Sequence, residues 1–118
     1  MASLNDGAPV VRAMQMARVD EDFTVWFATF ADSNKARQIK ADSRVFLSYY
    51  HDVEDVHLAG HGEILDDQAT KDDIWWEMLA KFFPGGSSDP NYVVLKVTPA
   101  SVEYRDFKST GYESTTLL

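Results

Sequence analysis

The feature that most constrains the fold of this chain is that its strand-like segments come in neighbouring pairs, with helical segments between the pairs. The six segments, rich in β-branched and aromatic residues, are 10–19, 23–30, 45–50, 56–65, 92–97 and 101–104. Short polar links join the members of a pair, which favours antiparallel hairpins over a doubly wound parallel sheet. We therefore predict a mainly β (α+β) fold whose six antiparallel strands close into a small barrel.

Two helices are predicted between the strand pairs. The first can be capped by Asp32 or Ser33 and runs to about residue 41. The second begins at Asp66-Asp67 and ends near Phe83, because a Pro-Gly-Gly sequence follows. Apolar residues recur at helical spacing along it, which predicts one buried face. These residues are Ile74, Trp75, Met78, Leu79 and Phe82.

Two glycines, Gly60 and Gly62, interrupt the fourth predicted strand. Glycine inside a strand often marks a bulge or a close approach of another backbone, as small barrels require. Residues 1–6 are expected to be a loose end, and residues 107–118 show no clear pattern. The 118 residues suit a single domain, with these two ends peripheral to it.

The composition argues against several classes of partner. A formal net charge of −8 opposes binding to the phosphate backbone of nucleic acid. The chain has no cysteine, so disulfides and thiolate chemistry are excluded, and a reducing cytoplasm is the expected location. No segment approaches the roughly 20 apolar residues of a membrane span, and the first residues lack the pattern of a secretory signal.

The histidines and serines do not form a recognisable catalytic or metal pattern. His57 and His61 share a strand face, but at about 3.3 Å per residue they lie roughly 13 Å apart, too far to share one metal ion. No Gly-x-Ser-x-Gly sequence is present, which argues against a serine hydrolase of that kind. We therefore predict no metal site and identify no catalytic acid or base.

One stretch has the chemistry of an anion site. The first turn of the helix that starts near Ser33 presents free backbone N–H groups, and Lys35 lies in that turn. A lysine there opposes the helix dipole unless an anion is bound, and Arg12 could add a bidentate contact to a phosphate. The alternative is that Ser33 is an ordinary cap and that Lys35 and Arg12 are solvated surface cations.

Several short motifs occur in one specific order. They are Arg12-Ala13-Met14, Val25-Trp26-Phe27-Ala28-Thr29, Ser33-Asn34-Lys35, Arg44-Val45, Leu58-Ala59-Gly60-His61-Gly62, Ile74-Trp75, Phe83-Pro84-Gly85-Gly86, Asp89-Pro90, Val97-Thr98-Pro99 and Val102-Glu103-Tyr104. In this order the chain resembles the general-stress-protein-26 branch of the pyridoxamine-5'-phosphate-oxidase-like superfamily, over roughly residues 10–106. The resemblance implies a split barrel that binds flavin mononucleotide (FMN).

The resemblance also implies a homodimer with a flavin site at each side of the subunit interface. Arg12, Ser33 and Lys35 would hold the phosphate, and the ring would lie along the first two strands, covered by the aromatic helix of the partner subunit. The implied cofactor-binding residues are Arg12, Ala13, Met14, Phe27, Ala28, Thr29, Ser33, Lys35 and Trp75, with Trp76 as a further candidate. Two departures stand out: Arg105 occupies a position where relatives often carry Trp, and we expect no C-terminal extension of the kind that the pyridoxamine-phosphate oxidases use to bind their substrate.

Three functions remain open from the sequence. The first is an FMN-dependent oxidoreductase of unknown substrate, with the chemistry supplied by the flavin. The second is a non-catalytic stress protein that stores or senses flavin. The third is a related barrel that binds haem, with His61 as the candidate axial ligand, or a deazaflavin. A true pyridoxamine-phosphate oxidase is not expected.

Overall fold

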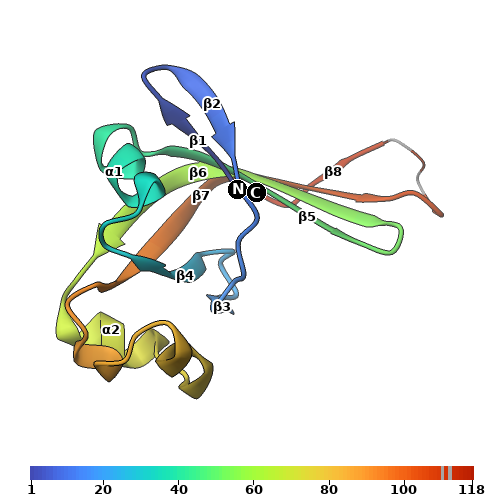
Figure 1. The fold of residues 1–118 in the computed structure, drawn as a ribbon. Helices are drawn as coiled ribbons and strands as arrows, with labels where there is room; N and C mark the ends of the chain where they lie inside the picture. The colour runs from blue at the N-terminus through green and yellow to red at the C-terminus, as the bar shows by residue number, and fades with distance from the viewer. Residues whose placement is uncertain (110, 112) are drawn as a thin grey trace.

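The structure is a computed structural model that describes residues 1–109, 111 and 113–118 (Figure 1). Its strands are β1 (Ala2–Asn5), β2 (Ala8–Val11), β3 (Arg18–Val19), β4 (Val25–Phe30), β5 (Arg44–His51), β6 (Glu54–Leu65), β7 (Tyr92–Asp106) and β8 (Thr115–Thr116). Its helices are α1 (Asn34–Ala41) and α2 (Gln68–Ile74), followed by two short 3-10 helices, η1 (Glu77–Lys81) and η2 (Gly86–Ser88).

The described strands form one antiparallel sheet in the order β2-β1-β5-β6-β7-β4-β3, and β8 pairs with β7. This path has two ends, at β2 and β3, so the barrel is split rather than closed. The predicted fold class, a mainly β, α+β split barrel with antiparallel strands and two helices, is confirmed. The described strands number eight instead of six: β1 and β8 are additional, and the division of 10–19 into β2 and β3 is offset by the fusion of 92–97 and 101–104 into β7.

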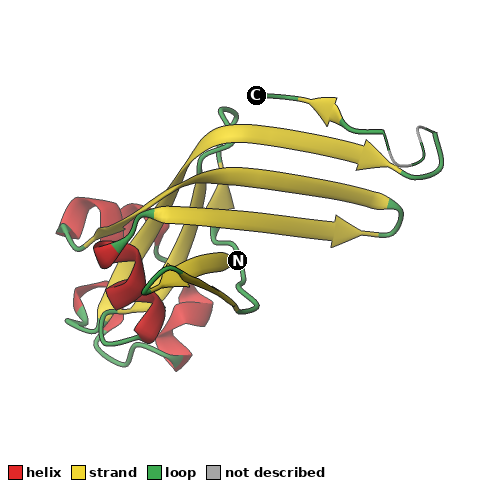
Figure 2. Cartoon of the chain, turned by 90° about the horizontal axis from the view of Figure 1, so that it is seen from above, coloured by secondary structure: helices red, strands yellow, loops and turns green. Residues whose placement is uncertain are grey.

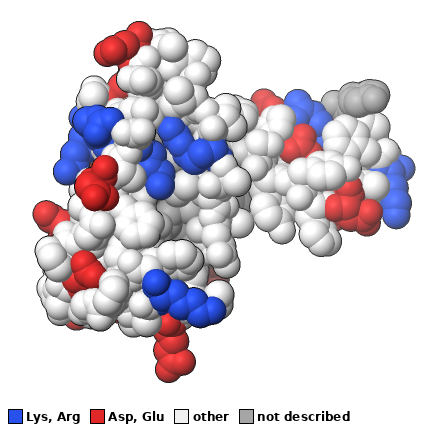
Figure 3. Space-filling view, in the orientation of Figure 1, with Lys and Arg blue, Asp and Glu red and all other residues white. Residues whose placement is uncertain are grey.

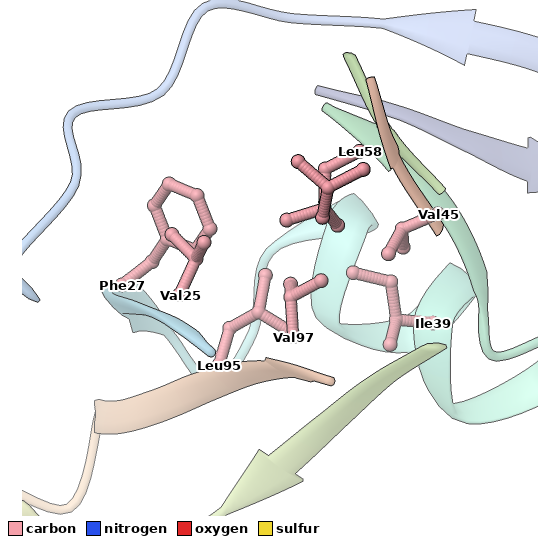
Figure 4. Packing of buried hydrophobic residues seen from close by; sticks show 8 residues of the cluster. Val25, Phe27, Ile39, Val45, Leu58, Leu95 and Val97 are labelled. Atoms are coloured by element: carbon pink, nitrogen blue, oxygen red, sulfur yellow. The ribbon is translucent and has the colours of Figure 1, made fainter. Parts of the chain in front are cut away.

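The core fills the inside of the curved sheet. Seven of its residues point toward one another from β4, α1, β5, β6 and β7 (Figure 4): Val25, Phe27, Ile39, Val45, Leu58, Leu95 and Val97. A second buried cluster lies where α2 and η1 pack on the sheet, and it contains Ile74, Leu79, Phe83, Tyr92 and Val94. Strand β7 contributes to both clusters, with Leu95 and Val97 in the first and Tyr92 and Val94 in the second.

The two predicted strands at residues 92–97 and 101–104 are one continuous strand, β7. Pro99 lies inside it, opposite Gly60 of β6, where the register shifts between Ala59 and Gly60. Proline lacks a backbone N–H and is tolerated within a sheet only at an edge or a bulge. The predicted bulge at Gly60 is therefore confirmed, and it explains why Pro99 does not end the strand.

The predicted strand at 10–19 is not continuous. The chain leaves the sheet after Val11 and rejoins it only at Arg18 and Val19, which pair with β4. Residues 1–6, expected to be a loose end, instead supply β1, which joins β2 to β5. Residues 10–19 alternate as a strand does, but this pattern does not reveal where Arg12 finds its hydrogen-bond partners. They are Ser3 of β1 and Gln38 of α1, and neither lies on the second predicted strand.

The second predicted helix is also shorter than expected. Its last helical hydrogen bond runs from Trp75 N to Lys71 O, and Trp75 and Trp76 both have extended backbone. The chain then forms η1 rather than continuing to Phe83. The break lets the neighbouring indole rings take different partners, because Trp75 packs against Tyr92 whereas Trp76 lines a cavity.

The body and an arm can be distinguished in the two ribbon views. The helices gather at one end of the sheet, and the far halves of β5, β6 and β7 project away from them with β8 alongside (Figure 2). No helix among the described residues is long and apolar enough to cross a membrane. The same residues contain no group of three or more His, Asp or Glu side chains placed to hold a metal ion.

Candidate functional site

A cavity of about 330 Å³ opens between the β2–β3 segment, the end of β4, the start of α1 and the segment around η1. We call it the Lys35 cavity. Its lining residues are Ala13, Met14, Gln15, Ala28, Thr29, Phe30, Lys35, Trp76, Met78, Leu79, Phe82 and Phe83. Its volume falls at the lower end of the range of small-molecule sites. Lys35 is the only ionisable side chain among the lining residues.

Lys35 owes its place to the cap of α1. Ser33 has extended backbone, and its hydroxyl accepts from Ala36 N at 3.3 Å, so the helix begins directly after it. The same hydroxyl donates to Phe30 O at 2.7 Å, which ties the start of the helix to the end of β4. The predicted N-cap is thereby confirmed, and the first turn of α1 carries Lys35 to the cavity wall.

Arg12 lies just after β2 and points toward α1. Its guanidinium donates from Nη1 to Ser3 Oγ at 2.7 Å and from Nη2 to Gln38 Oε1 at 2.9 Å. Gln38 lies one turn beyond Lys35 on the same helix, so Arg12 reaches the part of α1 that carries Lys35. Both acceptors of its guanidinium are neutral, while its backbone carbonyl accepts from the N-terminal ammonium of Met1 at 2.8 Å.

The two cations affect each other. Burial, and next the positive charge of Arg12, hold the pKa of Lys35 below its ordinary value. Burial likewise lowers the pKa of Arg12. Among the described residues, neither Arg12 nor Lys35 forms an ion pair with a carboxylate, although the chain carries a net charge of −8. Figure 3 shows Lys and Arg side chains gathered over the α1 region.

Thr29 adds a polar group to the same cavity. The residue is only 3% exposed, and its hydroxyl has no hydrogen-bond partner among the described residues. A buried polar atom without a partner costs about 1–3 kcal/mol. Such atoms are rare in folded proteins.

The opposite wall is apolar and aromatic. Phe30 stacks at a tilt on Phe83, with ring centroids 4.8 Å apart, and meets Phe82 edge-on at 6.5 Å. Phe83 is buried, whereas Phe82 and Met78 are 59% and 52% exposed at the rim. The cavity therefore combines a cationic end with a wall suited to a flat, apolar ring system.

Five of the nine residues implied by the resemblance line the cavity, and they are Ala13, Met14, Ala28, Thr29 and Lys35. The other four lie elsewhere. Arg12 adjoins the site through Gln38, the Ser33 hydroxyl caps α1, and Phe27 is buried in the barrel core. The ring of Trp75 packs on Tyr92, with centroids 5.4 Å apart. Trp76, the further candidate, lines the cavity.

Part of the site could not be predicted from the sequence. The cavity lining also includes Gln15, Phe30, the η1 residues Met78 and Leu79, and Phe82 directly after η1, and Gln38 holds Arg12. Met78, Leu79 and Phe82 carried a signal, since they belong to the apolar stripe, but a stripe alone predicts core packing. Gln38 carried none, because its partner Arg12 is 26 residues away.

Two other residues singled out from the sequence lie outside the cavity lining. Arg105 approaches the carboxylates of Asp55 and Glu103 at 3.6 Å and the ring of His57 at 3.3 Å, on the arm formed by β6 and β7. His61, the candidate haem ligand, is exposed and lies 3.0 Å from the hydroxyl of Ser43. Neither residue is a lining residue of the Lys35 cavity.

Comparison with known families covers nearly the whole chain. Residues 1–116 match the family described as pyridoxamine 5'-phosphate oxidase like. The chain belongs to this family. The membership agrees with the split barrel and with the order of motifs along the sequence. No curated protein shows a significant match to the chain.

Solved structures of similar proteins share the fold. General Stress Protein 26 from Bacillus anthracis superposes with a TM-score of 0.79 at 24% identity, covering 98% of this chain and 85% of that one. A pyridoxamine 5'-phosphate oxidase-related, FMN binding protein from Nostoc punctiforme gives 0.78 at 18% identity, with 99% and 85% covered. The general stress FMN/FAD binding protein from Xanthomonas citri gives 0.75 at 22% identity, with 100% and 86% covered.

Proposed function

We propose that this chain binds FMN in the Lys35 cavity and acts as a flavin-dependent oxidoreductase. The observation that carries the proposal is the pair of cations, Arg12 and Lys35, which no described carboxylate neutralises. In an acidic protein, two such cations beside the start of a helix suit a phosphate. Relatives of the same fold include an FMN binding protein and an FMN/FAD binding protein.

The rest of the cavity fits the ring of a flavin. The aromatic wall at Phe30, Trp76 and Phe82 can cover the face of the ring. In this proposal Arg12 and Lys35 bind the phosphate, and Ser33 orients the first turn of α1 toward it. A bound flavin supplies hydride or electron transfer, while the protein sets its access and electronics.

The proposal is tested by mixing the purified protein with FMN, removing the excess and recording the absorbance. We expect the bands of oxidised flavin to be retained. Arg12→Ala and Lys35→Ala should each weaken FMN binding about tenfold or more, because a charge-assisted hydrogen bond is lost. Lys40→Ala is the control, since Lys40 is exposed in the last turn of the same helix. Unchanged affinity in both variants would exclude the phosphate assignment.

We also propose that the chain forms a homodimer. A groove of about 290 Å³, which we call the Tyr49 groove, is lined entirely by hydrophobic side chains: Met16, Val19, Phe23, Val25, Leu47, Tyr49, Val56, Leu58 and Val102. Val19 and Tyr49 are 50% and 51% exposed within it. Exposed apolar surface of this kind is typical of protein interfaces.

A second copy of this chain is the proposed occupant of the Tyr49 groove, since the Lys35 cavity is open at its apolar rim and a partner could complete it. The test is the mass in solution, measured by light scattering, of the wild type and of Tyr49→Asp. Tyr50→Asp is the matched control, because adjacent residues of β5 face opposite sides of the sheet. A monomeric wild type would contradict the proposal.

The absence of cysteine is compatible with the proposed cytoplasmic location.

A further inference from the structure

The guanidinium of Arg12 is held entirely by neutral acceptors. Its Nη1 donates to Ser3 Oγ at 2.7 Å and its Nη2 to Gln38 Oε1 at 2.9 Å, and Ser3 Oγ in turn lies 3.3 Å from the same amide oxygen. Ser3 is 3% exposed on β1, and Gln38 is half-buried on α1. The three side chains therefore form a small network between the first strand, the segment after β2 and the helix of the site.

Neutral acceptors orient an arginine without neutralising it. Arginine has five N–H donors, and the hydrogen bonds found among the described residues use two of them. A carboxylate at position 38 would hold the guanidinium equally well, but it would also cancel the charge that a phosphate needs. A neutral amide fixes the geometry and leaves the charge of Arg12 in place beside Lys35.

We propose that Gln38, supported by Ser3, is a positioning residue that aims Arg12 at the phosphate of the ligand and keeps its charge available. This inference rests on the proposed FMN site. According to this inference, Gln38 makes the site bind a flavin that carries a phosphomonoester more tightly than a flavin without a phosphate. Gln38 acts through Arg12 and is not itself among the residues that line the cavity.

Gln38→Glu is the informative variant because it keeps the size of the side chain and its acceptor while adding a carboxylate next to Arg12. The measured quantity is the ratio of the affinities for FMN and for riboflavin, which lacks the phosphate, from quenching of flavin fluorescence. We expect the ratio to fall about tenfold, as for the loss of one charged contact. Riboflavin affinity should remain unchanged. Gln68→Glu, an exposed change of the same kind on α2, should leave the ratio unaltered.

A double-mutant cycle separates an effect through Arg12 from direct repulsion of the phosphate. In an Arg12→Ala background, Gln38→Glu should have little further effect on the ratio if Gln38 acts through Arg12. An equal fall in both backgrounds would overturn the inference. Should Gln38→Glu fail to fold, Ser3→Ala tests the positioning of Arg12 separately from its charge, because it removes the Nη1 acceptor and should lower the ratio.

The outcomes also distinguish the inference from the function on which it rests. If the wild type binds neither flavin, the proposed function fails and the inference fails with it. If the wild type prefers FMN and Gln38→Glu retains the full preference, the site stands and the role of Gln38 is refuted. If the preference falls in Gln38→Glu but not in its Arg12→Ala background, the inference is supported.

Discussion

A Cβ atom on Gly60 of β6 would lie 2.3 Å from the carbonyl oxygen of Thr98 on β7. This contact occurs at the bulge, where Gly60 pairs with Pro99 and the two longest strands of the sheet change register. Both atoms that would clash belong to the backbone or are fixed to it. The closeness of β6 and β7 at this point therefore requires a residue without a side chain.

Gly60→Ala should destabilise the protein severely, by about 3 kcal/mol or more, because β7 must move away for the methyl group to fit. Gly62→Ala is the comparison: its Cβ would meet the side chains of Ile39 and Leu95 at 2.9 and 3.1 Å, and these can shift slightly. Denaturant unfolding of both variants shows whether Gly60→Ala loses more stability than Gly62→Ala. Equal losses would show that the backbone contact at Gly60 is not decisive.

Tyr92 should make the protein sensitive to alkali. Its buried hydroxyl donates to Lys71 O at 2.8 Å, and burial, with a smaller effect of Asp72, raises its pKa from 10.0 to about 12. Because the folded pKa is above the unfolded one, the contribution of Tyr92 to stability is intact below pH 10 and is lost as the pH rises toward about 12.

The variant Tyr92→Phe should be less stable at neutral pH by about 1 kcal/mol, since one hydrogen bond is lost. Its stability should fall less steeply than that of the wild type between pH 10 and about 12. Urea unfolding at neutral pH and across this range measures both effects. Parallel pH curves for the two proteins would show that Tyr92 does not titrate in this way.

The adjacent tryptophans should separate stability from ligand binding. Trp75 packs on Tyr92 in the second buried cluster, so Trp75→Ala should reduce the free energy of unfolding by about 3 kcal/mol. Trp76 also packs against this cluster, but it lines the Lys35 cavity, so Trp76→Ala should in addition weaken FMN binding. The free energy of unfolding and the FMN affinity of each variant are measured. Equal losses of both quantities in the two variants would contradict the prediction.

Lys35 should destabilise the flavin-free protein. Its pKa is lowered by burial and by Arg12, so its charged form is disfavoured in the folded state. Lys35→Met should therefore unfold with a free energy about 0.5–1 kcal/mol higher than the wild type while losing FMN affinity. Lys40→Met, an exposed change on the same helix, should alter neither quantity. A less stable Lys35→Met would mean that Lys35 has a structural role.

The parts of the fold that the sequence predicted well are those set by local chemistry. The cap at Ser33 follows from the residue type, and the bulge at Gly60 follows from a glycine inside a strand. The second helix was overestimated because the apolar stripe from Ile74 to Phe82 does not reveal that the rings of Trp75 and Trp76 take different partners. The backbone turns between them for a tertiary reason that periodicity does not record.

The site divides in the same way. Lys35 could be nominated because the first turn of a helix attracts anions, and the family resemblance adds Thr29 and Met14. Gln38 could not be nominated, since its role depends on Arg12, which lies far away in the sequence. Phe82 had the pattern of a core residue, and only the fold shows that it stands exposed at the rim of a cavity.

The closeness of Arg12 and Lys35 has a consequence for the protein inside a cell. A ligand that binds the folded chain and not the unfolded one raises the folded fraction by mass action. If the proposed phosphate ligand relieves the repulsion between these two cations, the folded fraction of the newly made chain depends on the supply of this vitamin-derived cofactor. Cells short of riboflavin would then contain less of this protein at the same rate of synthesis, because more of it would be exposed to proteases.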